Sequence, residues 1–446
     1  MSRRKALLVI IDAARREDTH AAFDRSLSPE LASAARVNMI SPSCWTVPVM
    51  GSVLTGLHPA EHGLGWPLMQ ARCSAPTIAA MCDDAGRSFL LLSANRIYAP
   101  PMIPLRADQI ELPHRRRRKE VGLGRLLGIL DYGGRAILRR VQQMAASDGL
   151  PDLLVVHLQE AHHPYLPPPT GLAPRERLRY ALGHLRYYTS RQAQAWEFAA
   201  HATSDGWSDA RKRYLQCLDY DVRITEGLIA AYQQAGLLDD SLIVVTADHG
   251  EHLGEHQLAD HQASLHEELV RVPCAVMAPS MPPGAQITGQ FQHTDLLATL
   301  CGFLQIPPVG YEPSHQPLDL LSPRTWAAGH EHAFIEWTAW GDGQLANLRR
   351  RNPSYDFAPL RRDLLGVRTR RWKYIRGSDG SRRLYDLQRN PGETRDASAD
   401  NAAVVTELDA RLEQWRDGMR GSRHPAADEE PGGALLEQRL RDLGYI

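Results

Sequence analysis

The sequence predicts an α/β fold in which a mostly parallel sheet is sandwiched by helices. Short, nearly continuous apolar runs are typical of buried parallel strands, and they occur at residues 6–11, 89–92, 153–156, 242–245 and 274–277. Helical patterns lie between them, at residues 75–85, 134–145 and 211–234. This alternation of strand and helix indicates crossover connections, and therefore parallel strands with helices on both faces.

The pattern changes from about residue 325 onward. Residues 364–376 and 382–387 look like short strands on either side of a Gly-Ser-Asp-Gly turn, and residues 404–415 form an amphipathic helical pattern. We therefore expect a large α/β domain over residues 1–324 and a smaller α+β subdomain with a loosely held tail over residues 325–446.

Composition narrows the class of protein. The formal net charge is −1, so no overall field favours nucleic acid or anionic membranes. The basic run at residues 114–119 is either a solvated loop or a patch for an anionic substrate or a membrane surface, and the amphipathic stretch that follows it gives peripheral membrane contact weak support.

The cysteines and the N-terminal segment suggest a cytoplasmic protein. The six cysteines form no Cys-x-x-Cys pair, which indicates reduced, buried thiols instead of a disulfide scaffold. No run of 18 apolar residues occurs, so we expect no membrane span. The apolar run at residues 6–11 ends at Asp12 without a small-residue cleavage site, unlike a signal peptide.

The strongest chemical signal is the segment Thr246-Ala-Asp-His-Gly-Glu251, which directly follows a predicted strand. Asp248 and His249 offer one oxygen and one nitrogen to a single cation, a mixture that suits zinc or manganese better than calcium. An isolated Asp-His pair is also common in surface loops. Asp12 ends the first predicted strand and would reach the same edge of the sheet, where ligands of parallel sheets bind. Its alternative role is that of a helix N-cap.

Two further segments follow predicted strands or begin helices. Thr46 lies at or near the start of a helix whose first turn tolerates Pro48. A helix N-terminus suits phosphate or sulfate, and a hydroxyl that touches a divalent cation there is easier to deprotonate; the alternative is an ordinary N-cap threonine. Residues 159–168 follow the strand at 153–156, and a histidine there is placed to protonate a leaving group.

Together and in this order, these segments resemble the sulfatase-like family of the alkaline phosphatase superfamily. The resemblance places Asp12 at the first metal ligand and Asp248 and His249 at the last two. Thr46 lies nine residues before a Thr-Gly pair, the spacing at which the family has its nucleophile. The resemblance implies an alkaline phosphatase-like fold over nearly the whole chain.

The resemblance also assigns residues around the reacting group. His162 falls on the catalytic histidine, and His261 falls where the family often has a lysine or histidine that contacts the transferred group. We expect Asn95 and His163 to contact the substrate. Further stretches similar to the family are residues 54–63, 261–273, 371–375, 384–387 and 390–394.

The chain departs from true sulfatases at the nucleophile. Sulfatases have a cysteine or serine there, which is converted to formylglycine, and an arginine four residues later; these positions are Thr46 and Met50 here. Cys44 lies two residues early, so we expect no formylglycine. Two-metal phosphodiesterase relatives need an additional Asp-x-x-x-His motif. Here Asp209 has Arg213, not a histidine, four residues later. We therefore expect one metal ion.

The resulting hypothesis is a metal-dependent hydrolase. One divalent ion, zinc or manganese more than calcium or magnesium, would bind Asp12, Thr46, Asp248 and His249. Thr46 would attack a small anionic ester, with phosphodiesters and phosphonates favoured over sulfates, and His162 or His261 would assist the leaving group.

Two alternatives stay open. One is a transferase that passes a phospho- or sulfo-type group to an acceptor, with the helical pattern at residues 173–213 closing over it. The other is a non-catalytic binding protein on the same fold.

Overall fold

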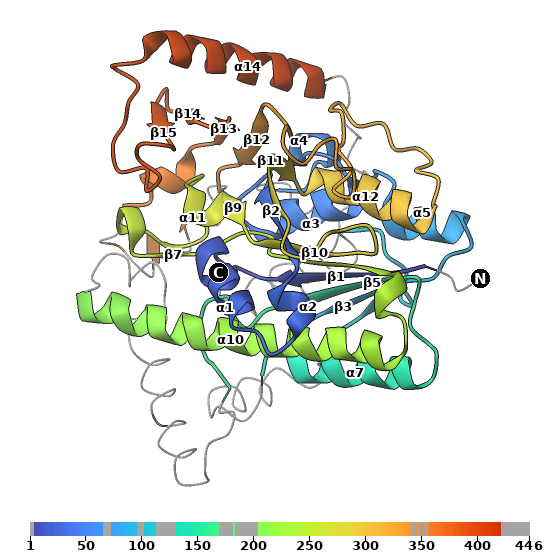
Figure 1. The fold of residues 1–446 in the computed structure, drawn as a ribbon. Helices are drawn as coiled ribbons and strands as arrows, with labels where there is room; N and C mark the ends of the chain where they lie inside the picture. Colours follow the sequence, from blue (N-terminus) through green and yellow to red (C-terminus); the bar gives the residue numbers. More distant parts are fainter. Residues whose placement is uncertain are drawn as a thin grey trace.

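The computed structural model describes residues 4–65, 73–95, 102–112, 131–168, 204–340 and 356–420, with a few single positions between them. Within these ranges a large twisted sheet lies between two layers of helices, and a smaller sheet with one long helix packs beside it (Figure 1). The expected α/β architecture with a C-terminal antiparallel sheet is therefore confirmed.

The large sheet has the strand order β11-β2-β10-β6-β1-β5-β3-β4, with β9 paired to β2. Most neighbours are parallel, and β10 runs antiparallel to both β2 and β6. The strands are β1 (Lys5–Ile11), β2 (Ala35–Ile40), β3 (Phe89–Ser93), β4 (Ile110–Glu111), β5 (Leu153–Leu158), β6 (Ser241–Thr246), β9 (Arg271–Val272), β10 (Cys274–Met277) and β11 (Gln286–Gln292). All five predicted apolar runs are strands of this sheet.

Helices cover both faces of this sheet (Figure 1). One layer holds α1 (Arg16–Asp24), α2 (Pro29–Ala32), α7 (Gly134–Ala146) and α10 (Ser204–Gln234). The other holds α3 (Thr46–Thr55), α4 (Pro59–His62), α5 (Ile78–Asp84) and α12 (Thr294–Leu304). Short elements complete the loops: η2 (Leu238–Asp240), β7 (His252–Leu253), η3 (Glu255–Gln257), β8 (Ala259–Asp260), α11 (Glu267–Val270) and η4 (Ala358–Arg361).

The C-terminal sheet has four antiparallel strands, β12 (Ala333–Trp337), β13 (Leu364–Arg368), β14 (Trp372–Gly377) and β15 (Arg382–Asp386). Residues 364–376, which looked like one strand, form two, because a turn closes where the Thr369 amide donates to the Trp372 carbonyl at 2.7 Å. Helix α14 (Ala402–Arg420) covers this sheet through its own apolar cluster, which includes Tyr374, Leu412 and Trp415.

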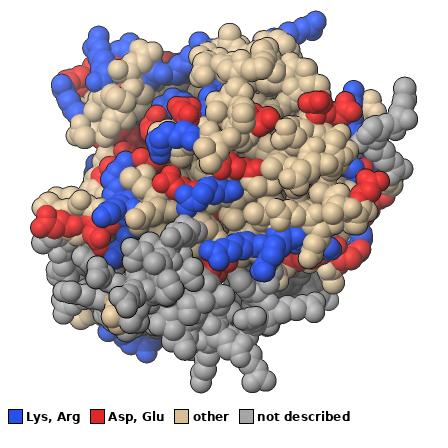
Figure 2. Space-filling model, turned by 60° about the horizontal axis from the view of Figure 1, so that its bottom comes forward, with Lys and Arg blue, Asp and Glu red and all other residues tan. Residues whose placement is uncertain are grey.

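The structure also bears on the expectations for the cysteines, for a membrane span and for surface charge. All six cysteines are free and buried, as expected. Among the described residues, no helix has the length and apolarity needed to cross a bilayer. On the face drawn in Figure 2, Lys and Arg are intermixed with Asp and Glu. The basic run at 114–119, most of the stretch 173–203 and the tail after residue 420 lie outside the described residues.

Candidate active site

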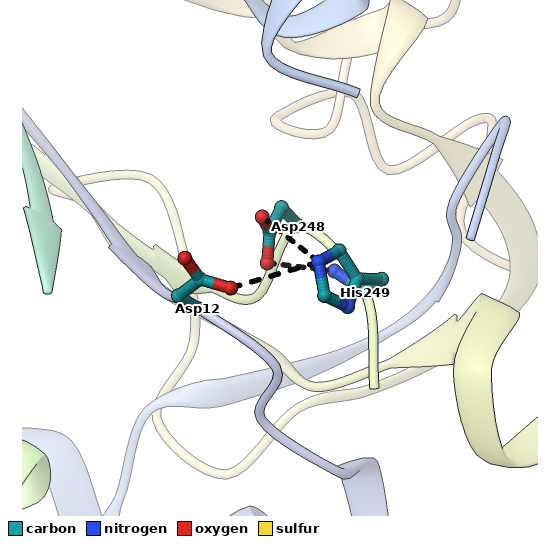
Figure 3. Close-up of side chains that lie close together, drawn as sticks. All are labelled: Asp12, Asp248 and His249. Atoms are coloured by element: carbon teal, nitrogen blue, oxygen red, sulfur yellow. Dashed lines mark hydrogen bonds and ion pairs between the residues drawn. The ribbon is translucent and has the colours of Figure 1, made fainter. Parts of the chain in front are cut away.

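Two neighbouring central strands bring the predicted metal ligands together. β1 pairs in parallel with β6, and Ile10 lies opposite Thr246. Asp12 follows β1 directly, and Asp248 and His249 follow β6 after one alanine. One ligand atom from each of the three side chains lies within 4.8 Å of the others, and all three residues are fully buried. Figure 3 shows both carboxylates and the imidazole turned toward a common point.

Hydrogen-bond acceptors converge at this point without a proton between them. His249 Nδ1 lies 2.8 Å from the Gly250 carbonyl, which only accepts, so Nδ1 carries the proton and Nε2 has a free lone pair. Nε2 faces Asp12 Oδ1 at 3.6 Å and Asp248 Oδ2 at 3.4 Å. Neither oxygen has a hydrogen-bond partner among the described residues. Three converging buried acceptors fit a divalent cation, and the oxygen and nitrogen donors are those of zinc or manganese sites.

The electrostatics of the three groups agree with this arrangement. Burial, and next the Asp12 carboxylate, raises the pKa of Asp248 to about 7. Burial opposes ionisation of Asp12 as well, but His162, His157 and His249 outweigh it and hold the pKa of Asp12 well below its usual value. Burial lowers the pKa of His249, so its ring stays neutral. A neutral imidazole beside carboxylates is the form that binds a metal.

Thr46 lies at the same point. It is the first residue of α3, after the N-cap Trp45, and its Oγ1 lies 3.2 Å from His249 Nε2. The N-cap makes no side-chain hydrogen bond, so backbone N–H groups of the first turn remain to meet an anion. The predicted nucleophile therefore adjoins the predicted metal ligands at a helix N-terminus.

Asn95 and His157 complete the surroundings of Asp12. The amide of Asn95 donates to Asp12 Oδ2 at 2.8 Å, so Asn95 contacts a candidate ligand directly, and a contact with substrate stays a prediction. His157, in β5, lies 3.4 Å from the same oxygen and 3.9 Å from Asp248 Oδ2. Sequence reasoning missed His157, although it lies between the apolar run at 153–156 and the polar stretch at 159–168.

A row of imidazoles leads from the candidate ligands toward the loop after β5. The His261 ring stacks on His249 with centroids 4.3 Å apart, and it meets the His162 ring edge-on at 4.9 Å. His162 Nδ1 donates to the His163 carbonyl at 2.5 Å, which leaves its Nε2 as the reactive nitrogen. The His163 ring packs against Tyr165 at 5.4 Å. The structure thus brings His162 and His261 into the row, and a contact of His163 with substrate stays a prediction.

Two acidic residues that sequence reasoning also missed surround His261. Asp260 Oδ1 lies 2.5 Å from His261 Nδ1, and Glu251 Oε1 lies 3.6 Å from the same atom. The three side chains are a second group whose geometry would admit a cation. His261 holds the pKa of Asp260 well below its usual value even though burial opposes this, whereas burial raises the pKa of Glu251. These contacts fix the orientation of the His261 ring.

Gly250 allows the metal loop to pack against α11. A Cβ atom at this position would lie 1.8 Å from the Glu268 carbonyl oxygen, and the Gly250 amide donates to the Leu269 carbonyl at 2.8 Å. Any larger residue would push the chain that carries Asp248 and His249 away from α11. The glycine is therefore a steric requirement of the site.

Met50 and Cys44, two residues at which the chain differs from sulfatases, are both buried. Met50, where sulfatases have an arginine, lies in the core, so α3 brings no cation from that position. Cys44 is fully buried, and burial raises the pKa of its thiol to about 12. A thiol with so high a pKa is a poor nucleophile.

Comparisons with known proteins show similarity to sulfatases. The Sulfatase family model matches residues 129–306. Over these residues the chain is similar to sulfatases. Arylsulfatase K of Mus musculus is 26% identical over 203 residues, which are 45% of this chain and 34% of that protein. An arylsulfatase of Volvox carteri is 26% identical over 221 residues, which are 45% and 33%.

The fold of the chain is shared with solved structures across nearly its whole length. The phosphonate monoester hydrolase SpPMH from Silicibacter pomeroyi has a TM-score of 0.68 at 18% identity, with 93% of this chain and 95% of that chain covered. BT1596, a 2-O GAG sulfatase, has a TM-score of 0.68 at 13% identity, with 97% and 100% covered. By contrast, the matches to the curated relatives span about a third of their length.

Proposed function

We propose that the chain is a metal-dependent ester hydrolase that uses Thr46 as its nucleophile. The observation that carries this proposal is the contact of Thr46 Oγ1, at the N-terminus of α3, with His249 Nε2, the atom on which the Asp12 and Asp248 carboxylates converge. A structural threonine would need only a backbone partner. Here the hydroxyl meets Nε2 of a buried imidazole that also faces two carboxylates.

Asp12, Asp248 and His249 would hold the cation, with the Thr46 hydroxyl beside them. When bound, a divalent cation at this position supplies Lewis-acid charge to the ester and favours ionisation of a nearby hydroxyl. Asn95 orients Asp12 by its hydrogen bond to Oδ2, and the Gly250 carbonyl orients the His249 ring. Such outer contacts stabilise ligand geometry in metal sites.

The reaction then follows from groups on the chain. Thr46 Oγ1 loses its proton to solvent and bonds to phosphorus or sulfur, while the bond from that atom to the leaving oxygen breaks. His162 gives a proton to the leaving oxygen through Nε2, because its Nδ1 is held by the His163 carbonyl. Water then bonds to the same atom and gives a proton to His162 Nε2, while the bond from that atom to Thr46 Oγ1 breaks and the Thr46 oxygen takes up a proton from solvent. The first turn of α3 and the His261 ring contribute positive potential to the anionic transition state.

Phosphodiesters and phosphonate monoesters are the proposed substrates, ahead of sulfate esters. A threonine does not form the formylglycine of true sulfatases. The arginine that sulfatases have four residues after the nucleophile is replaced here by the buried, uncharged Met50. An alkoxide nucleophile beside one cation suits transfer of a phosphoryl or phosphonyl group. Phosphonate monoester hydrolases and sulfatases share the fold alike, so this order of preference rests on Thr46 and Met50.

The test is a rate panel on aryl esters of phosphate, phosphodiester, phosphonate and sulfate type. Wild type is compared with Thr46→Ala and with Thr55→Ala, a matched truncation at the other end of α3, where the hydroxyl donates only to the Gly51 carbonyl. Each is assayed with and without chelator. We expect Thr46→Ala to lower kcat/KM at least about a thousandfold, chelator to abolish activity, and Thr55→Ala to keep it.

The outcomes separate the candidate functions. Thr46→Ala at wild-type rate would refute the nucleophile. Turnover that appears only after an acceptor alcohol or amine is added would identify a transferase. A folded protein that is metal-free and inactive on every ester would indicate a binding protein.

A further inference from the structure

A second charged cavity lies away from the catalytic residues. Its volume is ≈ 730 Å³, and α1, α11, β9, the start of β11 and the C-terminal sheet enclose it. None of the proposed ligands or catalytic residues lines it. Six of the side chains that line it are arginines: Arg15, Arg16, Arg36, Arg271, Arg368 and Arg370.

Three of these arginines already have carboxylate partners. Arg368 pairs with Glu267 at 2.8 Å, and Glu267 also receives Lys373 at 3.1 Å. Arg15 pairs with Glu255 at 2.7 Å. Arg36 pairs with Asp24 at 3.2 Å and also donates to backbone carbonyls. These contacts build the wall of the cavity and leave little charge for a ligand.

Arg16 and Arg271 form ion pairs with no carboxylate other than Glu17 among the described residues, and Arg271 Nε donates to Asn38 Oδ1 at 3.1 Å. They share one carboxylate, Glu17, at 2.5 Å and 3.9 Å, and its side chain is 77% exposed. The Nε atom of Arg16 is buried without a hydrogen-bond partner among the described residues. Exposed pairs of this kind are weak and easily exchanged for another anion. Arg370 adds a third guanidinium whose contacts are backbone carbonyls.

In addition to the effect of burial, the positive potential of these arginines lowers the pKa of neighbouring basic groups. Burial, with further contributions from Arg16, Arg36 and Arg271, lowers the pKa of His20 to about 3. Burial, and next the charge of Arg16, lowers the pKa of Arg271. The Asn38, Gln286 and Thr288 side chains, which also line the cavity, add neutral hydrogen-bonding groups. The cavity therefore offers what an anion needs: fixed charge, donors and partial exclusion of water.

We propose that this cavity binds a phosphate or sulfate group carrying at least two negative charges, with Arg16 and Arg271 as its principal contacts. Planar guanidinium groups match the oxygens of such groups in pairs. The cavity is large enough for a ligand well beyond a single inorganic ion. The group belongs either to a free inorganic anion or to a larger esterified molecule.

The experiment is isothermal titration with inorganic pyrophosphate and, separately, with sucrose octasulfate. The proteins are wild type, Arg16→Gln, Arg16→Gln/Arg271→Gln and the control Arg25→Gln. Arg25 ends α1 with a 65% exposed side chain and does not line the cavity. Each protein is measured as purified and after metal removal by chelator and dialysis, which separates this cavity from the metal site.

We expect binding to survive metal removal and to weaken about tenfold in Arg16→Gln and about a hundredfold in the double variant, since a charged hydrogen bond contributes about one factor of ten or more. Arg25→Gln should bind like wild type. Binding of pyrophosphate identifies an inorganic-anion site, and binding of the octasulfate alone identifies part of a larger ester. Equal affinity of the double variant and wild type, no binding by wild type, or loss of all binding with the metal overturns the proposal.

Discussion

Lys373 offers the sharpest test of how the C-terminal sheet supports the site. Its side chain is fully buried in β14, with Nζ 2.6 Å from Glu393 Oε1 and 3.1 Å from Glu267 Oε1. Lys373→Met keeps most of the length of the side chain and removes its charge. Glu267 keeps Arg368 at 2.8 Å, whereas the buried Glu393 keeps only His266 at 3.3 Å and the Glu267 amide at 2.6 Å.

Removing one partner of a buried ion pair costs about 3–5 kcal/mol. We expect about 3 kcal/mol, the low end of this range, because Glu393 retains the Glu267 amide and Glu267 retains Arg368. Urea unfolding of wild type, Lys373→Met, Glu393→Gln and the double variant measures this loss. The double variant should be more stable than the sum of the single effects implies, because it leaves no buried unpaired carboxylate.

The control for this cycle is Arg395→Gln, which removes an exposed ion pair with Asp400 and should leave the unfolding midpoint unchanged. A Lys373→Met protein within about 1 kcal/mol of wild type would refute the reasoning. Strict additivity of the two single changes would refute it as well.

Three further predictions concern the site and its surroundings. Burial lowers the pKa of His293 to about 4, and its Nε2 donates to the Ala247 carbonyl. As pH falls from 6.5 to 4, the unfolded chain takes up a proton that the folded chain does not, so about 3 kcal/mol of stability should be lost across that window. In His293→Gln the midpoint of urea unfolding should therefore depend less on pH. Gly250→Ala should lower both the melting temperature and the metal content, because its Cβ would meet the Glu268 carbonyl. The control Gly418→Ala, at a position in α14 with open space around it, should stabilise the fold by about 0.5–1 kcal/mol. Equal melting temperatures for the two variants would contradict the steric argument. Thr46→Ser should retain more activity than Thr46→Ala, since the hydroxyl and not the methyl group is needed, and equal rates of the two variants in the ester assay would exclude a nucleophilic role.

Sequence patterns located the buried centre of the fold well and its edges poorly. The runs at 6–11, 153–156 and 242–245 fall inside β1, β5 and β6 because parallel strands covered on both faces are continuously apolar. β2 was missed, because Arg36 and Asn38 interrupt its apolar pattern while they face the arginine-lined cavity.

The residues of the candidate site likewise include some that sequence patterns located and some that they missed. Asp12 and the Asp248-His249 pair stand at strand ends, where sequence position alone indicates a shared edge. His157 lies inside a strand, and Asp260 belongs to a two-residue strand in a long loop. Their approach to Asp12 and His261 depends on tertiary packing, which no local pattern encodes. The boundary between the two proposed domains stays a prediction.

The ion cluster of Glu267, Lys373 and Glu393 has a consequence for synthesis of the chain. All four proposed ligands, Asp12, Thr46, Asp248 and His249, leave the ribosome before residue 250. The loop that carries the last two packs on α11, and α11 is anchored by Lys373 and Glu393. A nascent chain that ends before residue 368 therefore has every ligand but none of the partners of Glu267, which are Arg368, Lys373 and Glu393. Firm metal capture should begin only once β14 and the segment up to residue 393 have emerged.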